Sequence, residues 1–115
     1  MAINCFGRAG LAAVVWLLGG MAAVGEEAEW RALYDCAEEH AVDVARVVVS
    51  VDEGAGLIVE VLCVDESTAV ANAMMSTRSD VVERSGSFGA AFTSFLSVIT
   101  REMRALIYTT KLEQS

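Results

Sequence analysis

The chain has 115 residues, with 8 basic and 16 acidic side chains, a formal net charge of −8 and no proline. This negative charge repels phosphate backbones and anionic lipid surfaces, so it argues against nucleic acid and acidic membranes as partners. The sequence contains no internal repeat, low-complexity tract or linker-like segment. These features predict one small domain.

The N-terminal segment, residues 1–25, is typical of a secretory signal peptide. Arg8 is its only charged side chain, and an uncharged apolar run extends from Leu11 to Val24. The run ends in small residues that a signal peptidase accepts, which predicts cleavage after Gly25. Because 14 residues are short for a bilayer core that needs about 20, we expect a secreted or periplasmic protein. An uncleaved membrane anchor is the alternative.

Residues 26–115 are expected to form a single small helical domain, with 16 acidic and seven basic side chains and a formal net charge of −9. A chain of this size buries only about 60% of its surface on folding, so it needs a covalent link or a partner. Loss of the leader leaves two cysteines, Cys36 and Cys63, in a compartment that permits disulfides. We expect one intramolecular bridge, which stabilises the fold by about 3 to 4 kcal/mol.

The first segment after the leader has the periodicity of an amphipathic helix. Its apolar side chains alternate at steps of three and four and predict one buried stripe, made of Trp30, Leu33, Ala37, Ala41, Val44, Val48 and Val51. The other face carries four carboxylates, Asp35, Glu38, Glu39 and Asp43. A capping box from Ser50 to Glu53 then predicts the start of a second helix.

Two structures compete for residues 47–64. The segment is rich in β-branched residues around a Gly54-Ala55-Gly56 turn signal, which favours a β-hairpin. The two cysteines lie 14 residues before and 13 residues after Ser50. In a helical hairpin turning there, both lie about 20 Å from the turn and can be bridged. We therefore expect an all-α domain with a disulfide-pinned helical hairpin, and keep an α+β fold with a β-hairpin at 47–64 as the alternative.

The second helix is expected over residues 51–75, with an apolar face broad enough to pack between two other helices. The helical spacing assigns to this face Leu57, Val61, Val64, Thr68, Ala71 and Met75. Polar residues and glycine over 76–87 predict a connection. The third helix is expected over 87–111, and its buried stripe comprises Phe88, Phe92, Phe95, Leu96, Ile99, Met103 and Leu106. The phenylalanines are expected to supply most of the core, which completes a three-helix domain.

No set of residues predicts an enzyme. The chain lacks the Gly-x-Ser-x-Gly nucleophile motif and a complete phosphate-binding loop. The four carboxylates of the first helix are expected on a convex helix surface. Acid–base catalysis needs two carboxyl groups whose pKa values differ because a cleft gives them different environments, and a convex surface provides no such cleft. We therefore expect no catalytic residue and no cofactor.

A metal or redox site is the alternative to a purely structural disulfide. Cys36 and His40 lie one helical turn apart, and Met74 and Met75 are soft donors. However, a bridged thiol cannot bind metal, His40 is the sole histidine, and neither cysteine belongs to a Cys-x-x-Cys motif at a helix start. We expect Cys36 and Cys63 to form a structural bridge and no metal to be bound.

Two short segments, Tyr34-Asp35-Cys36-Ala37 and Cys63-Val64-Asp65-Glu66, resemble a loose group of small exported bacterial helical proteins without an assigned function. The resemblance covers about the first half of the mature chain. It implies a disulfide-pinned helical hairpin and no catalytic residue. We expect a non-catalytic exported protein that binds an unknown protein partner or forms a homodimer, through its acidic helix or an apolar strip. An envelope metal-binding or thiol-redox protein is the alternative function.

Overall fold

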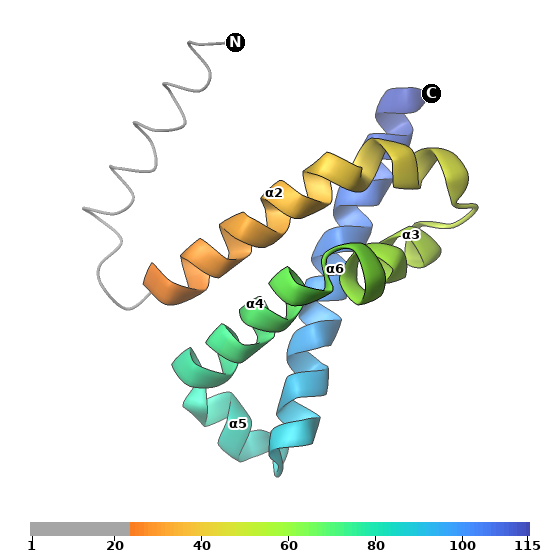
Figure 1. Cartoon of the computed structure of the whole chain (residues 1–115). Helices are drawn as coiled ribbons and strands as arrows, with labels where there is room; N and C mark the ends of the chain where they lie inside the picture. The colour runs from red at the N-terminus through yellow and green to blue at the C-terminus, as the bar shows by residue number, and fades with distance from the viewer. Residues whose placement is uncertain (1–23) are drawn as a thin grey trace.

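A computed structural model describes residues 24–115 as an all-α domain (Figure 1). Its elements are α2 (Val24–Val47), α3 (Val51–Leu57), the π-helical turn η2 (Ile58–Leu62), α4 (Val64–Thr77), α5 (Ser79–Ser85) and α6 (Phe88–Gln114). This part of the chain contains no strand, so the β-hairpin alternative for 47–64 is wrong. It also contains more helices than the three that were expected. Nearly all of the expected signal peptide lies outside the described residues.

The helices α2 and α4 run antiparallel and are tied together at two places along their length (Figure 1). The expected disulfide is confirmed: Cys36 of α2 is bonded to Cys63, with their Cα atoms 6.1 Å apart. Near the start of α2, the carboxylate of Glu26 accepts a 2.6 Å hydrogen bond from the Thr77 hydroxyl and is ion-paired with Arg78. The pinned pair is thus α2 and α4.

The expected continuous helix over 51–75 is broken at Cys63. The Cys63 amide donates to the Ile58 carbonyl at 2.7 Å, the five-residue bond of a π turn, and its own backbone is non-helical, with φ −125° and ψ 36°. A π turn contains one more residue than a turn of α-helix. The side chains beyond it therefore point in a different direction around the helix axis than they would in an unbroken α-helix. Val61 and Val64, expected on the buried face, are consequently 61% and 43% exposed.

Gly54 lies inside α3 and marks a close approach between helices. A Cβ atom there would lie 3.0 Å from a methyl group of Ile107, 3.1 Å from one of Val48 and 3.3 Å from one of Val44. Glycine therefore lets α3 sit directly on α6 and α2. The sequence interpretation of Gly54 as part of a turn signal missed this packing role.

The connection expected over 76–87 contains a further short helix, α5. It ends at Gly86, whose φ of +85° is the left-handed conformation that favours glycine at a helix end. Ser87 then caps α6 by accepting a 3.1 Å hydrogen bond from the Ala90 amide. The expected start of the third helix near residue 87 is confirmed.

The core lies where α6 contacts α2, α3 and α4. Its largest fully buried hydrophobic side chains come from several helices and include Leu33, Ile58, Val70, Met74, Ile99, Met103 and Ile107. The expectation that phenylalanines dominate this core is wrong. Phe95 is buried, but Phe92 is only partly buried and Phe88, the first residue of α6, is 73% exposed.

The basic C-terminal helix docks on acidic and carbonyl groups of the first half of the chain. The Lys111 ammonium donates to the carbonyls of Ala45 and Val48, both at 2.9 Å, and so caps the C-terminal end of α2. Arg104 is 3.1 Å from the carboxylate of Asp52 at the start of α3. Positive side chains of α6 thus contact the first half of the chain, and Lys111 complements the dipole of α2 as well as that of α6.

Candidate functional site

A shallow groove runs along α3 and η2. It has a volume of about 490 Å³ and is lined by Val48, Asp52, Glu53, Gly56, Leu57, Glu60 and Val61. Three of these side chains are apolar and three are carboxylates. A Cβ atom placed at Gly56 would have ordinary contact with one atom, a Glu60 carboxylate oxygen at 3.8 Å.

The groove is electrostatically negative. Asp52 has a cationic partner, Arg104, but Glu53 and Glu60 take part in none of the ion pairs within residues 24–115. Asp52 and Glu53 lie in the first turn of α3, where the helix dipole stabilises their negative charge. Two unpaired carboxylates therefore remain available to a cationic ligand.

Exposed valines occur in the groove lining and next to it in the sequence. Val61 lines it directly, while Val47 and Val49 flank the groove residue Val48 in sequence and are 73% and 91% exposed. Several exposed apolar side chains close together are typical of a protein interface. The sequence predicted a residual apolar strip, but it placed Val61 on the buried face, because the π turn could not be read from periodicity.

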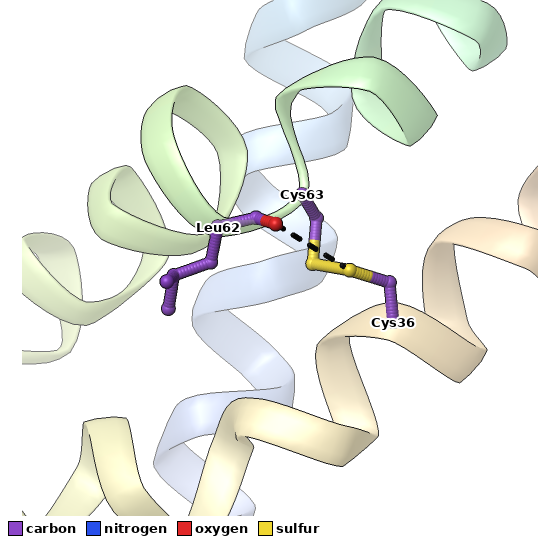
Figure 2. Close-up of a disulfide and its surroundings, with 3 residues drawn as sticks. All are labelled: Cys36, Leu62 and Cys63. Atoms are coloured by element: carbon purple, nitrogen blue, oxygen red, sulfur yellow. Dashed lines mark hydrogen bonds between the residues drawn. A yellow bond between two sulfur atoms is a disulfide. The ribbon is translucent and has the colours of Figure 1, made fainter.

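The disulfide lies where η2 ends and α4 begins (Figure 2). Cys63 is fully buried, whereas Cys36 is partly exposed. The Cys36 sulfur lies 3.7 Å from the Leu62 carbonyl oxygen, the contact drawn as a dashed line in Figure 2. Because a bridged sulfur carries no proton, this is a sulfur–oxygen contact in the oxidised protein. Reduction would turn it into a thiol hydrogen bond.

Cys63 is the N-cap residue of α4, although it belongs to no Cys-x-x-Cys motif. Glu66 follows three residues later in the first turn of the same helix. The sulfurs of Cys36 and Cys63 and a carboxylate oxygen of Glu66 all lie within 4.8 Å of one another. The Cys63 side chain makes no capping hydrogen bond at this helix start, so the Cys63-x-x-Glu66 spacing is not a capping box.

The other residues considered for metal or redox chemistry lie elsewhere. Met74 is fully buried and Met75 nearly so, both within the hydrophobic core. Among the described residues, the cluster of Cys36, Cys63 and Glu66 is the one group of three or more His, Cys, Asp or Glu ligand atoms close enough for a metal, and His40 does not belong to it. His40, Met74 and Met75 thus lie outside this cluster, and the alternative metal or redox function stays a prediction.

The acidic face of α2 lies on the convex surface that was expected. Its four members, Asp35, Glu38, Glu39 and Asp43, are all exposed. Asp43 is 3.8 Å from Arg46 on the same helix. These side chains form an exposed acidic face of the helix.

Two titratable groups connect helices and have shifted pKa values. Burial and a 3.0 Å hydrogen bond donated to Glu102 raise the pKa of Tyr34 to about 12, so its hydroxyl stays protonated and joins α2 to α6. Partial burial opposes ionisation of Glu26, but hydrogen bonds from Arg78 and Thr77 outweigh it and lower the pKa of this carboxyl. Sequence reasoning identified neither contact, since each joins residues more than 50 positions apart.

Comparison of the chain with family models, with curated proteins and with solved structures gave no match. Within the described residues, no helix is both long and apolar enough to cross a membrane.

Proposed function

We propose that this is an exported, non-catalytic binding protein whose α3–η2 groove holds a basic amphipathic segment of another protein. One observation carries the proposal: the groove combines apolar side chains with three carboxylates, of which Asp52 alone is ion-paired within residues 24–115. A helix that presents an apolar stripe between lysines or arginines complements both properties.

Charge favours a different protein over a second copy of this chain as the occupant. The expected mature chain has a formal net charge of −9, so two copies repel each other, whereas a cationic partner is attracted and steered towards the groove. This attraction is screened by salt, because the groove carboxylates lie at the surface. Binding should therefore weaken as ionic strength rises.

Export is supported by the leader-like sequence and by the disulfide, which is compatible with an oxidising compartment. The intact mass of protein from the exported fraction tests this part of the proposal. We expect a chain beginning at Glu26 that gains two hydrogens on reduction. A full-length chain with free thiols would contradict it.

The groove is tested with a labelled helical peptide of leucine and lysine, compared with a leucine–glutamate peptide of the same pattern. Fluorescence anisotropy should detect binding of the basic peptide alone. Glu60→Lys should weaken it at least tenfold, which is about 1.4 kcal/mol. The matched control is Glu83→Lys on α5, which changes the net charge equally but lies outside the groove.

Equal weakening by Glu60→Lys and Glu83→Lys would show that only net charge matters and would contradict a site in the groove.

Val61→Ser removes apolar area at an exposed position without altering charge, and should also weaken binding. Light scattering of the protein alone should give a monomer. A stable dimer occupying the groove would replace the proposed partner with a second copy.

A further inference from the structure

We infer that the reduced protein binds one thiophilic divalent cation, of the zinc class, through Cys36, Cys63 and Glu66. This site is separate from the groove and goes beyond the proposed binding function. It uses two sulfur ligands and one oxygen ligand, leaving the fourth position of a tetrahedral ion to water.

The ligand atoms are already assembled. All three lie within 4.8 Å of one another, and the Cα atoms of the two cysteines are 6.1 Å apart. Two sulfurs on one zinc ion, each bonded at about 2.3 Å, are about 3.8 Å apart. Once the bridge is opened, a short rotation of the two side chains accommodates the ion without separating α2 from α4.

The position of the two cysteines favours the thiolate form of the ligands and leaves the site accessible to a reductant and a metal ion. Cys63 is the N-cap of α4, and the positive end of the helix dipole stabilises its thiolate. Cys36 is partly exposed, which gives a route for a reductant and for the ion. Ser67, one turn beyond Cys63, is buried, and its hydroxyl has no hydrogen-bond partner among the described residues. It is a donor available to the second shell of such a site.

Opening the bridge takes two electrons from a dithiol. One thiolate of the dithiol attacks the sulfur of the partly exposed Cys36, the sulfur–sulfur bond breaks, and Cys63 leaves as a thiolate at the start of α4. The second thiol of the reductant then displaces Cys36 and closes the reductant's own disulfide. The ion binds both thiolates and the Glu66 carboxylate, and any thiol protons pass to solvent. Since the same sulfurs serve both states, the bridged and metal-bound forms exclude each other.

The test uses Co²⁺ as a spectroscopic substitute for zinc. The whole protein is reduced with a phosphine, freed of it under anaerobic conditions and titrated with Co²⁺. We expect one ion per chain, a sulfur-to-cobalt charge-transfer band, and displacement of cobalt by Zn²⁺. The oxidised protein should show no such band.

Glu66→Gln should lower the affinity for cobalt at least tenfold. Asp65→Asn is the matched control, because Asp65 also lies in the first turn of α4 but is not part of the cluster. Absence of the charge-transfer band, or equal effects of the two variants, would overturn the site. If reduction unfolds the chain, recovery of helical circular dichroism on adding Zn²⁺ supports the inference, and failure to recover overturns it.

Discussion

The two sides of this small domain are held together by different kinds of interaction. The α2–α4 pair is tied by a disulfide at Cys63 and by the Glu26 ion pair at the opposite end of α4. The α3–η2 side is held by apolar packing, including buried Ile58 and the close approach at Gly54, and by one surface ion pair. The covalent side is thus a scaffold, and the groove lies on the side without such ties. We therefore expect local unfolding to cost less free energy around the groove than in the α2–α4 pair, and the groove is where a partner would bind.

The largest expected effect comes from removing the covalent tie. Replacing Cys36 and Cys63 together by alanine should lower the free energy of unfolding by about 3 to 4 kcal/mol, because the open chain regains the entropy of a loop closed across 27 residues. Urea denaturation of the variant and the oxidised parent measures the difference. A change below about 1 kcal/mol would mean that non-covalent packing alone holds α2 against α4.

The Glu26 ion pair should make the same side sensitive to acid. Because its folded-state pKa is lowered, the stabilisation is present above the unfolded value of 4.5 and is lost as the pH falls below it. Glu26→Gln should therefore destabilise the protein by about 1 to 2 kcal/mol at pH 7 and much less at pH 3. Thermal unfolding across this range measures the effect. Glu29→Gln serves as control, and a pH-independent loss would argue against the ion pair as its source.

The groove side is tested by a pair of glycines within α3. Gly54→Ala should destabilise the domain by about 1 kcal/mol, because the added methyl group meets three core side chains and overpacking outweighs the gain in helix propensity. Gly56→Ala meets only a flexible carboxylate and should be neutral or stabilising by up to about 1 kcal/mol. Chemical denaturation compares the two. Effects of the same sign would show that α3 can shift away from α6.

Features that depend on local sequence patterns could be predicted from the sequence, whereas features that depend on packing between helices could not. Helical periodicity in α2 and α6 and the count of cysteines indicated the all-α class and the bridge. The break at Cys63 could not be predicted in this way, because a π turn arises from how α3 and α4 each pack against α6. The groove depends on that turn, which leaves Val61 exposed. Long-range contacts such as Tyr34 with Glu102 have no local signal at all.

The smallest effect is expected at the surface ion pair between Asp52 and Arg104. Both side chains are well exposed, so Arg104→Gln should change the free energy of unfolding by less than about 0.5 kcal/mol. The same substitution frees the Asp52 carboxylate beside the groove and should strengthen binding of the basic peptide at low salt. Arg101→Gln is the control, since it alters charge equally but pairs with no groove residue. If Arg104→Gln strengthens binding and Arg101→Gln does not, the groove carboxylate takes part in recognition without contributing much to stability. Equal gains in binding by the two variants would assign the effect to net charge.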